Sequence, residues 1–144
     1  MDNKQFTEKS FERALFESLY GNTDFDGGIN NAIALIGEKY EISRVYVFEN
    51  SEDNRFGDNT FEWCAAGITP QIDELQHMSY EEYGYYEMFA DNGAFICPDV
   101  KELPDISREL FESQDIKATL QYALYDKEEF RGFVGFDDCN GPPS

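Results

Sequence analysis

The sequence predicts one α+β domain in which an antiparallel sheet packs against helices. Apolar residues in the first forty positions recur with the spacing of helices, and the pattern then changes to the alternation typical of strands. The predicted strands include two hairpins, one on each side of a mainly helical middle, and hairpins join antiparallel strands. A length of 144 residues fits a single domain.

Two helices are expected at the start of the chain. The first has a stripe at i, i+3, i+4, i+7 and i+8, formed by Phe11, Ala14, Leu15, Ser18 and Leu19. It ends at Gly21–Asn22. The second begins near Asp26, a residue type that caps helix N-termini. One face of this second helix carries Ile29, Ala32, Ile33, Ile36 and Tyr40.

Two strands come next and form the first hairpin. Residues 43–49 (SRVYVFE) and 60–66 (TFEWCAA) are rich in β-branched and aromatic side chains, which are typical of strands. The polar residues 50–59 between them indicate a long hairpin loop.

The rest of the chain has shorter patterns with clear breaks at proline and glycine. The expected elements are a short helix at 70–77, short helices and loops over 80–91, a strand at 94–97, a helix at 106–113, and strands at 117–125 and 129–136. The last two strands are joined by a charged turn. The order of elements is therefore that of a sheet with helices inserted between its two hairpins.

The composition excludes several classes of partner. The chain has 30 acidic and 11 basic residues, and its formal net charge of −19 repels phosphate backbones and anionic lipid surfaces. We therefore expect neither a nucleic-acid partner nor a membrane partner. The 13 Phe, 9 Tyr and 1 Trp supply a core and oppose disorder. Cys64, Cys97 and Cys139 form no CxxC pair and fit reduced thiols in a cytoplasmic protein.

The order of these elements, together with several local motifs, resembles a GAF domain. The most specific stretch is 110–137 (LFESQDIKATLQYALYDKEEFRGFVGFD), where a helix end, a strand, a charged turn and a glycine-containing last strand follow one another. Matching motifs occur at 43–49, at Trp63 and over 99–104 (DVKELP), so the resemblance covers about 11–137. It implies an α+β, GAF/PAS-like fold: a central antiparallel sheet of about five or six strands with helices on both faces.

The ligand signatures known in this family are absent from the sequence. There is no N-K-x-F-D-E motif of the cyclic-nucleotide-binding domains and no Cys followed by His, as bilin attachment requires. The one histidine, His77, lies in a segment expected at the surface, which disfavours haem. The resemblance therefore implies a sensory or regulatory module and leaves its cofactor unknown.

Two other kinds of chemistry are disfavoured by the residues present. Residues 22–27 resemble the start of a calcium loop, but Ile33 stands where the bidentate glutamate belongs. One GAF-fold family reduces methionine sulfoxide with cysteine thiols. Here the glycine-flanked cysteine motif of that family is missing, and Cys97 lies beside Asp99, whose charge would raise the thiol pKa.

Adjacent acids occur at Glu81–Glu82 and at Asp137–Asp138. Paired carboxylates serve in acid–base catalysis, but neighbours on a strand point to opposite faces. In a chain with 30 acidic residues, a solvated surface is the expected explanation for both pairs.

Aromatic residues are the best candidates for a ligand site. In GAF domains the ligand cavity lies between the sheet and the irregular segment that covers it, which corresponds here to residues 68–95, the lid. Tyrosine and tryptophan suit such a site because they combine apolar area with one hydrogen-bonding group. The expected ligand-binding residues are Trp63, Tyr83, Tyr86, Phe89, Phe95 and Tyr122. Trp63 and Tyr122 are expected to form the cavity floor; the alternative is that these rings simply fill the core.

Three functions follow as hypotheses. The first is a non-enzymatic sensory module that binds a small molecule and acts on a fused output domain, such as a bacterial diguanylate cyclase or histidine kinase. The second is a ligand-free dimerisation or scaffold module, favoured if the protein's own rings fill the cavity. The third is a thiol-dependent enzyme of the methionine sulfoxide reductase type.

The organisation of the chain suggests a part of a larger protein. Residues 1–144 are expected to form one GAF-like domain that lacks the closing C-terminal helix, because the last strand is followed only by a short polar tail. The stripe of Phe11, Leu15 and Leu19 fits pairing with a second copy in a homodimer as well as burial against the chain's own sheet or second helix.

Overall fold

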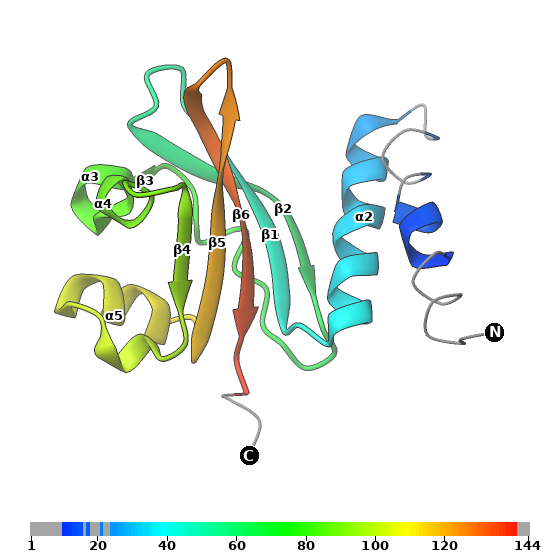
Figure 1. Cartoon of the computed structure of the whole chain (residues 1–144). Helices are drawn as coiled ribbons and strands as arrows, with labels where there is room; N and C mark the ends of the chain where they lie inside the picture. Colours follow the sequence, from blue (N-terminus) through cyan, green and yellow to red (C-terminus); the bar gives the residue numbers. More distant parts are fainter. Residues whose placement is uncertain (1–9, 16, 18–20, 22–23, 141–144) are drawn as a thin grey trace.

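The computed structural model describes residues 10–15, 17, 21 and 24–140 of the chain. Its centre is a six-stranded antiparallel sheet with strand order β3-β2-β1-β6-β5-β4 (Figure 1). The strands are β1 (Arg44–Asn50), β2 (Phe56–Cys64), β3 (Met78–Ser79), β4 (Ala94–Cys97), β5 (Ala118–Asp126) and β6 (Glu129–Asp138). The predicted fold class is confirmed.

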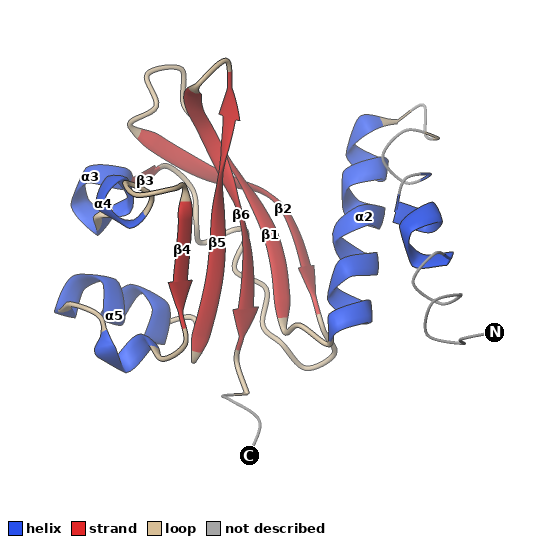
Figure 2. Cartoon of the chain, viewed as in Figure 1, coloured by secondary structure: helices blue, strands red, loops and turns tan. Residues whose placement is uncertain are grey.

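Helices pack on both faces of the sheet, as expected. They are α2 (Phe25–Tyr40), α3 (Tyr80–Tyr83), α4 (Tyr85–Met88), the 3₁₀ helix η1 (Val100–Glu102) and α5 (Asp105–Glu112). Figure 2 shows α2 on one face, here the α2 face, and α3, α4 and α5 on the other, here the lid face. α2 packs on β2 and β1. None of the described helices is long and apolar enough to cross a membrane.

The first predicted helix is confirmed over the residues that the structure describes. Residues 10–15 are helical, and Phe11 packs edge-on against Tyr40 of α2, with ring centroids 6.0 Å apart. Ser18, Leu19 and Asn22 lie outside the described residues. The stripe is therefore seen in contact with the chain's own second helix.

The N-cap of α2 is Asp24 and not the predicted Asp26. The Asp24 backbone is extended, and its carboxylate accepts a hydrogen bond from the N–H of Asp26 at 3.2 Å. Asp26 lies in the first turn, where a negative charge still favours the helix dipole. The prediction was wrong by two residues because the run Asp-Phe-Asp offers two carboxylates of equal capping propensity.

β2 begins at Phe56, four residues earlier than the strand predicted at 60–66. Gly57 pairs with Asn50, and Asn59 pairs with Phe48. These polar residues join the strand because the ladder bonds use backbone groups, so the pairing needs no apolar side chains. The hairpin loop is correspondingly shorter than the predicted loop over 50–59.

The helix predicted over 70–77 is wrong, since this segment forms turns. The carboxylate of Glu62 accepts hydrogen bonds from the N–H groups of Gln71 at 2.9 Å and Ile72 at 3.3 Å. These bonds satisfy backbone groups at the start of the segment without a helix. The short helices within 80–91 and the later helix and strands are confirmed, with ends that differ from the prediction by at most two residues. β3 and η1 were not predicted because two or three residues are too few for a periodic pattern.

Gly37 of α2 touches the indole of Trp63 on β2, and a Cβ at position 37 would clash with the ring atoms Cζ3 and Cε3. We predict that Gly37→Ala lowers the unfolding free energy by about 1–3 kcal/mol, because overpacking outweighs the higher helix propensity of alanine. Urea unfolding measures the change. In a Trp63→Phe background, the same alanine should be neutral or stabilising; an equal loss in both backgrounds would contradict the steric explanation.

Candidate functional site

The space between the lid and the sheet is filled by aromatic side chains. Tyr46 and Phe48 of β1 and Phe133 of β6 project from the sheet, and Tyr80, Tyr85 and Phe89 from the lid complete one buried cluster. The rings of Phe48 and Phe133 stack 4.5 Å apart, and Tyr85 stacks on Phe133 at 5.2 Å. These contacts hold the lid directly on the sheet.

Among the described residues, a small cavity of about 10 Å³ lies in this region. Residues lining it include Tyr46, Phe48, Tyr85, Phe111, Gln114 and Gln121. Such a volume corresponds to about one water molecule, whereas small-molecule pockets measure roughly 300–1,000 Å³. The lid side is therefore closed in this conformation.

Four of the six predicted ligand-binding residues lie on the lid side, in different settings. Phe89 belongs to the buried aromatic cluster, and Phe95 and Tyr83 pack against it while partly exposed. Tyr86 is 42% exposed, and its hydroxyl donates a hydrogen bond to the backbone oxygen of Asn54 at 2.8 Å. The first three residues thus serve as core, and Tyr86 fastens the lid to the β1–β2 hairpin loop.

Trp63 and Tyr122 lie on the opposite face of the sheet, so the expectation that they floor the lid cavity is corrected. Trp63 is paired with Val45, which lies in the core under α2, and it contacts that helix. Tyr122 is paired with Val134 and lines a groove beside α2. Because side chains alternate along a strand, a shift of one residue moves a ring to the other face. One cavity therefore does not hold all six residues.

The floor of the lid cavity is formed instead by Tyr46 and Gln121, whose side chains point to the other face of the sheet from Trp63 and Tyr122. Tyr46 lies between Val45 and Val47, and Gln121 immediately precedes Tyr122. The register of the strands would have identified Tyr46 and Gln121 as floor residues. It becomes visible once β6 is placed between β1 and β5, which pairs Tyr46 and Gln121 with the same residue, Gly135.

A buried ion pair adjoins this floor. The side chains of Arg44 on β1 and Asp137 on β6 are at most 1% exposed, and Arg44 Nη1 donates to Asp137 Oδ2 at 3.0 Å. Tyr46 and Thr119 both donate hydroxyl hydrogen bonds to Asp137 Oδ1, at 2.7 and 2.9 Å. The expectation of a solvated Asp137 is therefore wrong, because β6 turns this carboxylate into the lid face.

The same arginine reaches two connecting segments. Its Nη2 atom donates to the backbone oxygen of Thr69 at 2.9 Å and to that of Gln114 at 3.3 Å. Gln121 Nε2 donates to the Tyr46 hydroxyl at 2.8 Å, but Gln121 Oε1 is buried and accepts no hydrogen bond from the described residues. A donor group that entered the small cavity would therefore meet a ready acceptor.

Burial dominates the electrostatics of the network. It raises the pKa of Asp137 to about 6, although Tyr46, Arg44 and Thr119 oppose that shift by stabilising the carboxylate. Burial also raises the pKa of Tyr46 well above its ordinary value. Tyr46 therefore remains a neutral hydrogen-bond donor to Asp137 throughout the neutral range.

The three thiols occupy settings that do not activate them, and the histidine lies at the surface. Burial raises the pKa of Cys64, Cys97 and Cys139, which disfavours the reactive thiolate. His77 is exposed, as expected, and stacks on Phe56 with ring centroids 3.9 Å apart. Within the described part of the chain, no group of three or more potential metal-binding His, Cys, Asp or Glu residues comes together.

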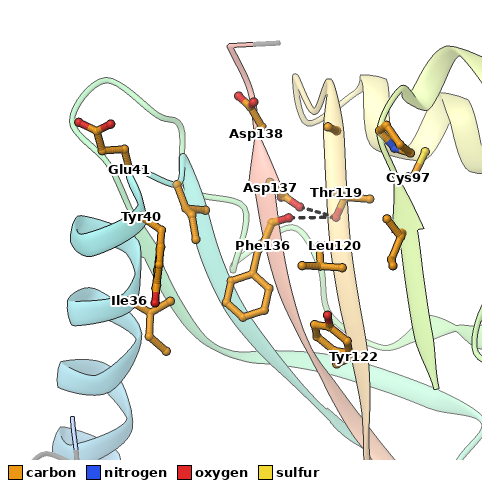
Figure 3. A pocket seen from close by; sticks show the side chains of 14 residues that line it. Ile36, Tyr40, Glu41, Cys97, Thr119, Leu120, Tyr122, Phe136, Asp137 and Asp138 are labelled. Atoms are coloured by element: carbon orange, nitrogen blue, oxygen red, sulfur yellow. Dashed lines mark hydrogen bonds between the residues drawn. The ribbon is translucent and has the colours of Figure 1, made fainter. Parts of the chain in front are cut away.

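The α2 face contains a second and much larger hollow of about 600 Å³ (Figure 3). It lies between the C-terminal end of α2 and the strands β6, β5 and β4. Apolar side chains form its floor and sides: Ile36, Tyr40, Ile96, Leu120, Tyr122 and Phe136. We call it the α2 groove.

Comparison with solved structures identifies the fold to which this arrangement of strands and helices belongs. No family model matches the chain. The phycoerythrobilin-bound GAF domain from a cyanobacterial phytochrome has a TM-score of 0.77 at 11% identity, covering 97% of this chain and 86% of that one. A far-red absorbing protein with bound biliverdin IXα has a TM-score of 0.76 at 18% identity, covering 93% and 85%. The chromophore-binding domain of a Stigmatella aurantiaca bacteriophytochrome has a TM-score of 0.71 at 13% identity, covering 92% and 52%.

The chain has the GAF fold.

A sequence relative adds a signalling context. Over 129 residues the chain is 31% identical to the methanogenesis regulatory histidine kinase FilI of Methanothrix harundinacea. The match covers 85% of this chain and 14% of that protein. This GAF-fold domain therefore spans a small fraction of the length of the curated relative it matches.

We predict that Asp137→Asn lowers the unfolding free energy by about 1–3 kcal/mol, because the amide nitrogen cannot accept the hydrogen bonds that Arg44, Tyr46 and Thr119 donate to the carboxylate. Thermal or urea unfolding measures the loss. Asp138→Asn is the matched control: Asp138 is the next residue, and its partly exposed side chain accepts a hydrogen bond from the nearby Asn140 N–H. Its change should stay within about 0.5 kcal/mol. Equal losses in the two variants would contradict a special role for the buried pair.

The raised pKa of Asp137 predicts a pH dependence with a defined sign. Between its ordinary value of 3.8 and its folded value of about 6, the folded chain binds more protons at this site than the unfolded chain. The stability that Asp137 gains from binding its proton in the folded state is therefore complete below pH 4 and is lost as the pH rises through 6. The stability difference between wild type and Asp137→Asn should shrink by about 1 kcal/mol from pH 5 to pH 7. A difference that grows over this range would contradict the raised pKa.

Proposed function

We propose that this GAF-fold domain is a non-enzymatic sensory or regulatory module of a larger cytoplasmic signalling protein. In this proposal the lid is the part that responds to a small molecule, and the change in its packing is passed to a fused output domain. The observation that carries the proposal is the match to a regulatory histidine kinase of which this chain spans only 14%.

The construction of the lid supports a responsive role. α3 and α4 are single turns of four residues each, joined at Gly84, whose φ of 75° suits glycine better than other residues. Tyr80 and Tyr85 from these turns lie in the aromatic cluster. A ligand would have to displace such rings, so closed and open packings of the lid are the two states that binding would bias.

The position of the polar floor supports a ligand with hydrogen-bonding groups. If Tyr85 moves outward, the space opens toward Gln121, Tyr46 and the Arg44–Asp137 pair. Three of the similar solved structures carry bilins or belong to bilin-binding photoreceptors by their descriptions. Biliverdin is therefore a rational first probe, although this chain lacks the Cys-His motif for bilin attachment.

The closed cavity supports a second candidate, a ligand-free dimerisation or scaffold module. The protein's own Tyr and Phe side chains leave only about 10 Å³ in the lid region. Such a domain would transmit through its helices without a ligand. The raised pKa values of all three thiols argue against the third hypothesis, a thiol-dependent reductase.

Native mass spectrometry of the purified chain, with and without added biliverdin, tests the proposal. A discrete additional mass that is lost on denaturation supports the sensory module and indicates the chemical class of ligand. An apo spectrum in both samples, with a dimer, supports the ligand-free module instead. An apo monomer in both samples contradicts both candidates for the isolated domain.

We predict that Tyr85→Leu distinguishes a lid-side ligand from a ligand bound elsewhere. Tyr85 is buried on Phe133, so its loss should lower stability by about 2–4 kcal/mol and change the amount of retained ligand. Tyr122→Leu, at a 43% exposed position on the opposite face of the sheet, is the control and should change neither strongly. Equal ligand retention in the two variants would place the ligand outside the lid cavity. Thermal unfolding and native mass spectra provide the two measurements.

A further inference from the structure

A relay of hydrogen bonds connects the buried carboxylate of Asp137 with the lid cavity. Asp137 Oδ1 accepts from the Tyr46 hydroxyl at 2.7 Å, and the oxygen of that hydroxyl accepts from Gln121 Nε2 at 2.8 Å. At the far end of the relay, Gln121 Oε1 is buried and accepts no hydrogen bond from the described residues. Gln121 also lines the small cavity under the lid. The relay therefore runs from an ionisable group to the floor of that cavity.

The direction of every bond in the relay depends on the charge of Asp137. A tyrosine hydroxyl has one hydrogen, and Tyr46 directs it to the carboxylate. The lone pairs of Tyr46 therefore face Gln121, which must turn its amide nitrogen, a donor, toward them. Thr119 reinforces this orientation, because its hydroxyl also donates to Asp137 Oδ1 and its oxygen lies 3.4 Å from Gln121 Nε2. While Asp137 is ionised, the amide oxygen of Gln121 is thus the atom turned away from the relay.

A proton on Asp137 Oδ1 reverses the relay. The new O–H donates to the oxygen of Tyr46, and the Tyr46 hydrogen then rotates toward Gln121. When the Gln121 amide turns by half a rotation, its oxygen accepts this hydrogen and gains the partner that it lacks in the ionised state. Thr119 has an alternative acceptor of its own, the backbone oxygen of Phe136 at 3.4 Å (Figure 3). The reversal therefore needs no movement of the backbone.

The surroundings of Asp137 permit the change of charge and direct the proton to Oδ1. Burial raises the pKa of this carboxyl to about 6. Arg44 opposes protonation and occupies Oδ2 at 3.0 Å, but its Nε atom also lies 3.8 Å from Glu62 Oε2 on β2. Burial raises the pKa of the titratable groups that remain around the ion pair, so they stay neutral: Tyr46 of β1, Cys64 of β2, Cys139 beyond β6 and Tyr85 of α4. β5 and the connection that precedes it contribute uncharged groups: Gln114, Thr119 and Gln121.

We propose that the relay of Asp137, Tyr46 and Gln121 is a pH-dependent switch that reverses the hydrogen-bonding character of the lid-cavity floor. When Asp137 is ionised, Gln121 presents its amide oxygen, an acceptor, to the cavity. When Asp137 is protonated, Gln121 presents its N–H groups, which are donors. The proton comes from solvent and stays on Asp137, while one hydroxyl hydrogen and one amide group change direction.

The reversal changes which ligand group the floor would accept. Above pH 6, a ligand with an N–H or O–H group at its inner end would be favoured, and below pH 6, one with a carbonyl or carboxylate oxygen. This consequence rests on the proposed function, because it requires a ligand under the lid. The reversal itself does not, since it involves the protein's own residues alone.

NMR of the full chain, labelled with ¹⁵N and ¹³C, follows both ends of the relay between about pH 5 and about pH 7.5. The Cγ shift of Asp137 reports its proton, and NOEs of the Gln121 amide protons report their direction. In the protonated state these protons should approach the rings that line the cavity: Phe48, Tyr85 and Phe111. Gln114 is an internal control, because it lines the same cavity but its Nε2 donates to the backbone oxygen of Leu110 at 3.1 Å.

Three variants separate the relay from general effects of pH. Tyr46→Phe removes the hydroxyl that joins the two ends. Tyr80→Phe is the matched control, because Tyr80 is a buried tyrosine of the same aromatic cluster whose hydroxyl donates to Asn50 instead. Asp137→Asn places an amide N–H where the carboxyl proton would lie, so it should hold Gln121 in the protonated arrangement at every pH.

We expect the Gln121 amide signals to change with the same midpoint as the Asp137 Cγ shift, near pH 6, while those of Gln114 stay constant. In Tyr46→Phe the pH-dependent change of Gln121 should fall to the level of Gln114, and in Tyr80→Phe it should keep its wild-type size and midpoint. The proposal is overturned by a Gln121 amide that keeps one direction while Asp137 titrates, or by an Asp137 that stays ionised over the whole range. An unchanged Gln121 transition in Tyr46→Phe would overturn it as well. None of these outcomes involves a ligand, so they are distinct from a failure of the proposed function.

Discussion

The buried ion pair between Arg44 and Asp137 is the constraint on which the rest of the lid face depends. It joins the first and last strands of the sheet, which lie side by side at its centre. Through Thr69 and Gln114, the same arginine also fixes the start of the lid and the connection from α5 to β5. Such a pair adds little net stability compared with apolar packing, but it is costly to break. Its effect is to specify one arrangement of the segments around the floor of the lid cavity.

The two faces of the sheet have opposite characters. On the lid face, rings from the strands and the lid interlock and leave a cavity of about 10 Å³ beside a buried polar network. On the α2 face, a hollow of about 600 Å³ remains beside a single helix. The sheet therefore separates a closed face filled by rings from a face with an open hollow. The strands of the sheet link the two, since neighbouring residues on a strand face opposite sides.

Much of the fold was predictable because many of its elements follow from the local periodicity of apolar residues. The helical spacing from Ile29 to Tyr40 and the alternating residues of 43–49 correspond closely to α2 and β1. The predictions were wrong where a distant partner decided the structure. The segment 70–77 resembles a helix, but Glu62 on β2 satisfies its backbone as a turn. Asp137 resembles a surface acid in a chain rich in acids, and only the facing Arg44 explains its burial.

The sequence by itself determined the fold class, the order of the elements, the aromatic content of the lid and the resemblance to GAF domains. These features depend on neighbouring residues or on motifs in a fixed order, so they survive without coordinates. The tertiary structure alone decided which rings share a cavity, since Trp63 and Tyr122 face α2 while Tyr46 and Gln121 face the lid. The physical reason is the two-residue period of a strand. The period divides residues into two faces, and only the pairing of strands with one another and the helices packed on them determine which face is which.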